Sequence, residues 1–435
     1  MESEIRALLE ARRDDVSRVC SVRGASERKD GLNRLLRDVL RESSLCYVDG
    51  ELSAFNGRAY EPVGMNDVRD AVVNVLSDMG VGASDLGRMG DTAFCELRRK
   101  TRVPDMGVIA FRNCLLKVKD MCTYPFSPDC VPYLELDYDF DGNAQCPGWL
   151  AFLEEILPDE EMRDVLQEFF GMCFMDRSAM SIEKMAMFVG SGANGKSVVC
   201  DVIREVMGGN GHVGNLSPDQ LQDQKQVTGL VGRLLNIAPD VRRGAAFDSA
   251  LKALASSQEI TGWKLYAGGV TVKCPPLAFA LNEMPYFKDT TNAFFRRLLV
   301  FKFDIVIPED RQNRRLASQI IESERCGVFR WIMEGRRRLM LNKGMFSHCD
   351  AMDMALAELR SDVRLGQSQV LQKLEENGYS TTPQYSGQQT TRVMAAMVAT
   401  ALNGYTRNQI TREMKKAGVE IGRGGDGLYY QLYEI

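Results

Sequence analysis

Residues 185–207 read MAMFVGSGANGKSVVCDVIREVM, and this stretch decides the fold. Its first five residues are apolar without interruption, which predicts a strand buried on both faces, as in a parallel sheet. From residue 198 the apolar residues recur at helical spacing, which predicts an amphipathic helix. Residues 190–197 lie between these elements and fit the phosphate-loop pattern GxxxxGK[ST]. A strand, a glycine-rich loop and a helix in this order predict a nucleotide-binding α/β domain.

The residue types of this loop suit the binding of ATP and Mg²⁺. Glycines let backbone N–H groups curl around phosphates, and the N-terminus of the following helix adds partial positive charge. Lys196 is predicted to reach the terminal phosphates, and the hydroxyl of Ser197 is predicted to bind Mg²⁺. The predicted nucleotide ligands are Gly190, Gly192, Asn194, Gly195, Lys196 and Ser197.

Polar residues stand at the ends of three further apolar runs. LLNIAPD ends at Asp240, which is predicted to hold Mg²⁺ through water and to orient the attacking water. LAFALN ends at Asn282, whose amide is predicted to sense the γ-phosphate. Arg296 and Arg297 precede LLVFKF, and a guanidinium offered to a neighbour's γ-phosphate accelerates hydrolysis by about 10³–10⁵. The alternative for either arginine is a structural ion pair.

The motifs GSGANGKS, NIAPD, ALNEMP and FFRRLLVFKF follow one another within about one hundred residues. In this order they resemble a superfamily 3 helicase, most closely the phage, plasmid and poxvirus primase-helicase type. The preceding IAFRNCLLKV, YDF and WLAFLEEI also resemble the module that comes before the ATPase in that family. The resemblance covers roughly residues 105–345.

This resemblance implies rings, usually hexamers, with ATP between subunits and an arginine finger donated across the interface. It also implies translocation along single-stranded or forked DNA by a hairpin between the second and third motifs, here WKLYAGGVTVKCPP. By position Lys264 and Tyr266 fall at the tip of this hairpin and Lys273 on its return strand. A cation suits a phosphate and an aromatic ring suits a base, although both are also common on ordinary protein surfaces.

Two departures from the family pattern matter for the chemistry. Many members carry a glutamate or an acidic pair where this chain has Asp240 after Pro239, so Glu283 and Glu259 are further candidates for activating water. The leading 100 residues are too short for a primase-polymerase domain and offer no set of metal-binding carboxylates. We therefore predict no primase activity, which leaves a separate primase or polymerase open as a partner.

Composition excludes several classes of protein. With 435 residues, 45% hydrophobic and 26% charged, the chain is globular and long enough for two to four domains. No apolar stretch approaches the roughly 20 residues of a membrane span, and the charged start does not resemble a signal peptide. We expect no membrane partner and a cytoplasmic location, in the host cell if the element is viral. A net charge of −5 argues against non-specific nucleic-acid binding over the whole surface, but it allows binding through a local basic element.

The sequence offers few cysteine and histidine residues at spacings that could bind a metal. The twelve cysteines are scattered without a CxxC pair, and there are two histidines, so we predict free, mostly buried thiols. Asp137, Asp139 and Asp141 have the spacing of a calcium loop, but Gly148 stands where a bidentate glutamate is required. We interpret this segment as an acidic linker.

The predicted fold class is α/β, with a P-loop (AAA+-like) parallel sheet as the core. Residues 1–104 form a small α+β region that includes a three-stranded meander, and 105–180 form a mostly helical module. Residues 181–345 form the ATPase domain. Residues 346–435 form a helical and winged-helix domain, in which a helix over 406–417 is followed by a hairpin.

Three functions fit these observations. The first is an ATP-dependent, ring-forming DNA helicase in the replication of a phage or other mobile element. The second is an ATP-gated origin-binding or loading factor without processive unwinding. The hairpin lysine and the arginine pair favour the first, because an adaptor does not need translocating contacts. The third, a metabolic P-loop kinase, would need an acceptor pocket and a lid, for which no motif is visible.

Overall fold

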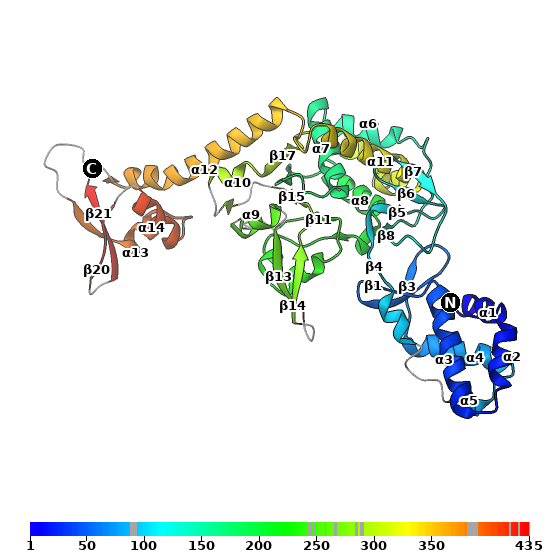
Figure 1. Cartoon of the computed structure of the whole chain (residues 1–435). Coiled ribbons are helices and arrows are strands. Elements are labelled where there is room, and N and C mark those ends of the chain that lie inside the picture. The colour runs from blue at the N-terminus through cyan, green and yellow to red at the C-terminus, as the bar shows by residue number, and fades with distance from the viewer. Residues whose placement is uncertain are drawn as a thin grey trace.

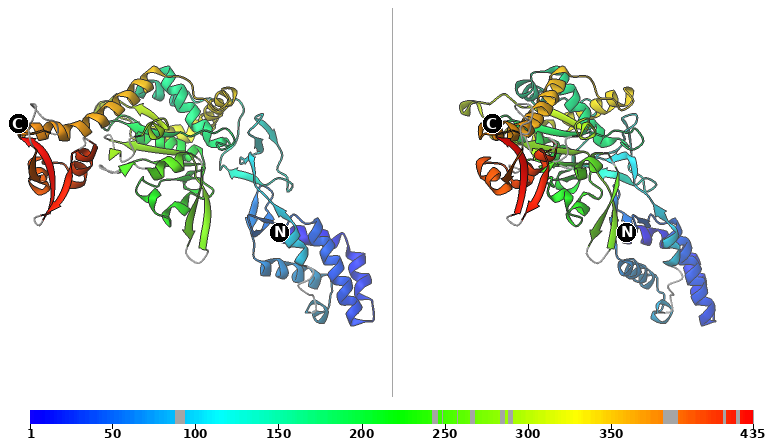
Figure 2. Two further views of the ribbon diagram at one scale, coloured as in Figure 1. Left: turned by 60° about the vertical axis from the view of Figure 1, so that its left-hand side comes forward. Right: turned by 90° about the vertical axis from the view of Figure 1, so that its left-hand side faces the viewer.

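The protein is elongated, with its N-terminal helices and its C-terminal strands at opposite ends of a central sheet (Figures 1 and 2). The computed structural model describes residues 1–87, 94–241, 246–247, 249–256, 258–264, 268–282, 286–287, 291–380, 390–416, 419–424 and 427–434.

The N-terminal end combines helices with a small sheet in the order β3-β2-β1-β4. β1, β2 and β3 pair antiparallel, so the predicted meander is confirmed, and β4 joins β1 in parallel. The apolar residues of the helices and of this sheet form a single cluster. The elements are α1 (Glu2–Glu10), α2 (Arg13–Cys20), α3 (Ala25–Glu42), β1 (Cys46–Val48), β2 (Glu51–Phe55), β3 (Tyr60–Pro62), α4 (Met65–Asp78), α5 (Ala83–Leu86) and β4 (Thr101–Arg102).

The segment before the central sheet contains more strand than the mostly helical module that we expected. Its four strands form a sheet in the order β7-β6-β5-β8, which precedes two helices. The elements are β5 (Asp105–Ala110), β6 (Leu115–Lys117), β7 (Cys122–Tyr124), β8 (Pro132–Glu135), α6 (Pro147–Ile156) and α7 (Glu160–Gly171).

The central sheet has five parallel strands in the order β10-β11-β15-β9-β17, which confirms the predicted α/β class. β9 (Met185–Val189) has the predicted bounds and lies inside the sheet, which explains its uninterrupted apolar run. The other strands are β10 (Val213–Gly214), β11 (Leu235–Ala238), β15 (Leu277–Leu281) and β17 (Leu298–Lys302). The helices around the sheet are α8 (Lys196–Val206), α9 (Ser249–Ala255), α10 (Asn292–Phe295), α11 (Leu316–Leu341) and α12 (Asp350–Glu376).

Both faces of the sheet are covered, because successive residues of a strand point to opposite sides. Ala186 and Phe188 of β9 belong to a hydrophobic cluster with α6, α7, α8 and α11. Met185 and Met187 belong to a second cluster with α9, α10 and α12. The helices that precede and follow the sheet therefore share its core.

Two glycines bring α7 and α11 into close contact. A Cβ at Gly335 would lie 2.2 Å from the carbonyl oxygen of Gln167, and a Cβ at Gly171 would lie 2.2 Å from the nitrogen of Arg336. Beside this contact the carboxylate of Glu168 is fully buried and is 2.8 Å from Nε of Arg338. This buried ion pair links α7 to α11 beside the glycine contact.

The C-terminal end begins within α12 and contains α13 (Ala395–Ala401) and α14 (Arg407–Lys416). β20 (Ile421–Gly424) and β21 (Gly427–Glu434) pair antiparallel, so the predicted hairpin is confirmed. β21 also pairs with β18 (Tyr379–Ser380) and β19 (Thr391–Met394). Within the described residues, no helix has the length and apolar character needed to cross a membrane.

Candidate nucleotide site and neighbouring hairpin

The loop over residues 190–197 joins the C-terminal end of β9 to α8. Gly192 and Gly195 have φ angles of +112° and +82°, which glycine adopts without strain. A Cβ at Gly190 would lie 2.1 Å from Nδ2 of Asn194 and 2.4 Å from the carbonyl oxygen of Phe303. The loop therefore requires glycine at these positions for steric as well as conformational reasons.

Lys196 lies inside this loop and is 5% exposed. Its Nζ donates to the carbonyl oxygen of Gly190 at 2.6 Å and to Oδ1 of Asn194 at 2.8 Å. Asn194 in turn donates from Nδ2 to the carbonyl oxygen of Phe303, just after β17, at 2.9 Å. Burial lowers the pKa of Lys196, whereas the charge of Asp240 acts to raise it. An ammonium held in this way is desolvated and close to the loop's backbone groups, as phosphate binding requires.

Asp240 and Asn282 lie at the same edge of the sheet as the loop. Asp240 follows β11 by two residues and Asn282 follows β15 directly, and both are exposed. β15 lies between β11 and β9, and the nitrogen of Gly190 donates to the carbonyl oxygen of Leu281 at 3.1 Å. Because parallel strands end at one edge, the carboxylate, the amide and the loop face one region; Ser197, in the first turn of α8, is exposed there too.

Arg296 and Arg297 lie at the opposite edge, where β17 begins. The five residues of a strand such as β9 span about 16 Å, so neither arginine reaches the loop of its own chain. Arg297 is 7% exposed; its Nη2 is 2.7 Å from Oε2 of Glu183, and its Nε donates to Oγ of Ser256 at 3.0 Å. Arg296 also contacts Glu183, at 3.1 Å, but its side chain is 64% exposed. The structure thus separates a buried structural arginine from an exposed one.

Sequence reasoning missed Glu183, which precedes β9 by two residues. Burial raises its pKa, but the ion pair with Arg297 and further contacts outweigh this, so its pKa is lower than usual. The local signal was weak, because a single acidic residue before a strand does not identify its partner more than one hundred residues away.

The predicted hairpin is present as β13 (Glu259–Lys264) and β14 (Gly268–Lys273), which pair antiparallel. Lys264 pairs with Gly268, whereas Tyr266 lies outside the described residues, as does Glu283. Lys273 pairs with Glu259 at the base, and its Nζ is 3.6 Å from Asp176.

The position of the hairpin base corrects one expectation. Four residues after Lys273 the chain enters β15 at its N-terminal end, which is the sheet edge opposite the loop. Glu259 pairs with Lys273 and therefore lies at that edge as well. It is not placed to activate water at the loop of its own chain, whereas Asp240 lies on the loop side.

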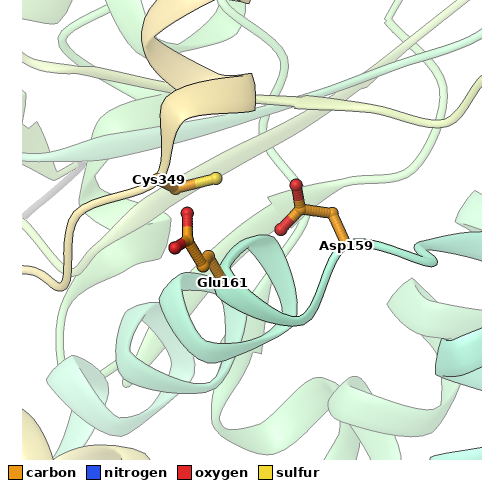
Figure 3. A group of neighbouring side chains, drawn as sticks. All are labelled: Asp159, Glu161 and Cys349. Atoms are coloured by element: carbon orange, nitrogen blue, oxygen red, sulfur yellow. The ribbon is translucent and has the colours of Figure 1, made fainter.

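The cysteines and one small acidic cluster are further side chains of metal-binding types. None of the twelve cysteines, all of them in the described part of the chain, forms a disulfide, and all except Cys95 and Cys122 are buried or half-buried. Among the described residues, Asp159, Glu161 and Cys349 have ligand atoms within 4.8 Å of one another (Figure 3). Asp159 already caps α7 by accepting from the nitrogen of Met162 at 2.9 Å, and burial raises the pKa of the Cys349 thiol. We assign no ion to this cluster.

Comparison with known proteins finds a match to one family model, whose function is unknown, and a match to a viral protein. Residues 188–297, from β9 to the arginine pair, match the family model described as "Family of unknown function (DUF5906)". The chain is 25% identical over 195 residues to a protein of Acanthamoeba polyphaga mimivirus whose description is "Putative helicase". That match covers 40% of this chain and 19% of the viral protein, so the chain spans about a fifth of its relative.

Distant likenesses also exist among solved structures. Two apo structures of the NrS-1 C-terminal region share 10% and 12% identity with this chain, with TM-scores of 0.48 and 0.44. Each comparison covers 92% of this chain and 98% of the other.

Proposed function

We propose that this protein is an ATP-hydrolysing, ring-forming DNA helicase of the superfamily 3 type that acts in the replication of a phage or other mobile element. One observation carries the proposal: the glycine-rich loop and the exposed Arg296 lie at opposite edges of one parallel sheet. A nucleotide on the loop can meet this arginine only if a neighbouring subunit supplies it. Repetition of such a head-to-tail contact gives a ring when its rotation closes, and the ring that we propose is a hexamer.

The residues at the loop edge suit hydrolysis of ATP. The N–H groups of residues 190–197 and the buried Lys196 would hold the phosphates, and Asn282 would contact the γ-phosphate. Ser197 and Asp240 are hard oxygen ligands at the same edge, which fits Mg²⁺, and this ion would neutralise phosphate charge when bound. Asp240 would orient the attacking water, and Arg296 of the neighbour would stabilise the transition state.

The hairpin and the C-terminal end would contact DNA. Lys264 belongs to the last hairpin pair that the structure describes, with Gly268. We propose that Lys264 and Tyr266 contact the DNA strand in the pore. α14 followed by the β20–β21 hairpin supports a winged helix. The AAA+-like core and the winged helix belong to this proposal, as do the domain boundaries at residues 104, 180 and 345.

Strand displacement on forked DNA tests the proposal. We expect the wild-type protein with ATP and Mg²⁺ to unwind the fork, and Lys196→Ala to lose hydrolysis and unwinding while still assembling, as followed by mass photometry. Normal turnover by Lys196→Ala would show that the loop is misinterpreted. ATP-dependent assembly on origin DNA without unwinding would instead identify a loading factor. A protein that stays monomeric with nucleotide and DNA would overturn the ring.

A further inference from the structure

The hairpin has one face against the protein and one face in solvent. Gly262 and Val272 are buried, and a Cβ at Gly262 would lie 2.5 Å from Cγ2 of Thr228 in the short helix η5 (Gln226–Leu230). Residues of a strand alternate between faces, so the next residues point outward. The outer face consists of Glu259, Thr261 and Trp263 on β13 and of Gly269, Thr271 and Lys273 on β14.

Trp263 presents a large aromatic ring on this outer face. It is 54% exposed, and its partner in the register is Gly269, which has no side chain to cover the indole. Its main-chain nitrogen donates to the carbonyl oxygen of Gln224 at 2.9 Å, which anchors the strand beneath the ring. An exposed indole next to a glycine, on a strand whose main chain is anchored, is a platform on which a nucleic-acid base can stack.

A cationic pocket lies at the base of the same face. It has a volume of about 190 Å³, and its lining includes Thr271 and Lys273 of β14, Arg233 before β11 and Arg177 after α7. None of its lining residues is acidic. Since a water molecule takes about 30 Å³ of liquid, the pocket has room for a phosphate group.

The two arginines of this pocket donate to main-chain carbonyl groups, which carry no net charge. Arg177 is 5% exposed and donates to the carbonyl oxygens of Cys274 at 2.5 Å and Ala255 at 3.5 Å. Arg233 donates from Nε to the carbonyl oxygen of Gly229 at 3.1 Å, and from Nη1 to two further carbonyls.

Acidic groups stand at the rim of this pocket rather than in its lining. Asp176 is 3.6 Å from Nζ of Lys273, and Glu259 is opposite Lys273 in the hairpin register. Burial lowers the pKa of Arg177, which reflects the cost of keeping a cation there, and a bound anion would offset that cost.

We infer that the outer face of the hairpin and the pocket at its base form a track for single-stranded nucleic acid. Trp263 stacks on a base, and Arg233, Lys273 and Arg177 hold backbone phosphates. From Gly269 to Lys273 the strand advances about 13 Å, which is about four nucleotides at the 3.4 Å spacing of one B-DNA strand. The inference rests on the proposed function for the identity of the ligand, and it adds contacts away from the hairpin tip.

Binding of a fluorescent twelve-residue oligothymidylate to the full chain, without ATP, tests the track. We expect Trp263→Ala to weaken binding about 5- to 150-fold, and Trp263→Phe to retain most of the affinity. We expect Arg233→Gln to weaken binding and to reduce the slope of log K against log salt by about 0.7, as for one lost phosphate contact. Trp263→Ala should leave that slope unchanged.

Two exposed residues provide matched controls. Met345 is 69% exposed and the side chain of Arg18 is 77% exposed, and neither belongs to the hairpin or its pocket. Met345→Ala and Arg18→Ala should bind the oligonucleotide as the wild type does. Because Trp263 is exposed, Trp263→Ala keeps the test decisive even if Arg233→Gln does not fold.

Three outcomes would overturn the inference. Unchanged affinity of Trp263→Ala would remove the stacking platform. Stabilisation by inorganic phosphate that Arg233→Gln abolishes, with unchanged oligonucleotide binding, would identify a small-anion site. A change in assembly by Trp263→Ala without a change in affinity would make this face an interface between copies. Failure of ATP hydrolysis or unwinding would refute the proposed function alone, because the binding assay contains no ATP.

Discussion

Complementation between two inactive variants tests the arrangement of the loop and the exposed arginine. Lys196→Ala removes the ammonium from the loop edge, and Arg296→Ala removes the guanidinium from the opposite edge. Each variant alone should lose hydrolysis, and the loss for Arg296→Ala should be about 10³–10⁵-fold, or roughly 4–7 kcal/mol of transition-state stabilisation. The fold should survive, since an ion pair as exposed as Arg296–Glu183 contributes about 0–1 kcal/mol.

The mixed ring has a predictable activity. An interface is competent when one subunit supplies an intact loop and its neighbour supplies an intact arginine. In rings assembled at random from equal amounts of the two variants, about one half times one half, or a quarter, of interfaces meet this condition. We therefore expect up to about a quarter of the wild-type rate.

The assay uses doubly tagged rings. Lys196→Ala and Arg296→Ala subunits are co-expressed with different tags, rings that carry both tags are purified, and ATP hydrolysis is measured without DNA, so that sites need not act in turn. Arg337→Ala is the matched control, because the Arg337 side chain is also 64% exposed and pairs with a glutamate. Mixed rings as inactive as the parents would refute the reasoning, since an arginine that acts within its own subunit cannot complement.

Two further predictions concern packing and pH. Gly190→Ala should abolish nucleotide binding and lower the free energy of unfolding by about 1–3 kcal/mol, because its Cβ would clash with Asn194 and Phe303. Gly211→Ala is the control, since nothing lies within 4 Å of a Cβ at that position. Equal nucleotide affinities of the two variants in calorimetry would contradict this prediction. Arg297→Ala should lower the free energy of unfolding, measured by urea denaturation, by about 1.5–3 kcal/mol. This loss should be larger than the loss caused by Arg296→Ala. The pKa of Glu183 is lower in the folded protein than in the unfolded chain. Its ion pair therefore contributes fully to the free energy of unfolding above the unfolded pKa of about 4.3, and this contribution is lost as the pH falls through the folded pKa. The difference in free energy of unfolding between the wild type and Arg297→Ala should therefore become smaller below pH 4. A difference that does not depend on pH would refute the ion pair.

Local patterns in the sequence were enough to predict the elements around the loop. The bounds of β9 follow from five apolar residues, and the meander of β1–β3 and the hairpin over 421–434 follow from turn residues between short apolar runs. These features depend on residues close together in the chain, whose periodicity reflects which face is buried. Asp240 and Asn282 could be placed at strand ends for the same reason. The hairpin over 259–273 was implied by the family resemblance rather than by a local pattern.

Tertiary structure decided what those residues meet. The sequence offered Arg296 and Arg297 as equals, but only the fold buries Arg297 against Glu183 and leaves Arg296 exposed. The outward position of Trp263 depends on the packing of Gly262 against η5, and the small sheet β5–β8 depends on pairings between separated segments. Each of these outcomes is a contact between distant parts of the chain, and local periodicity carries no record of which distant partner a side chain will find.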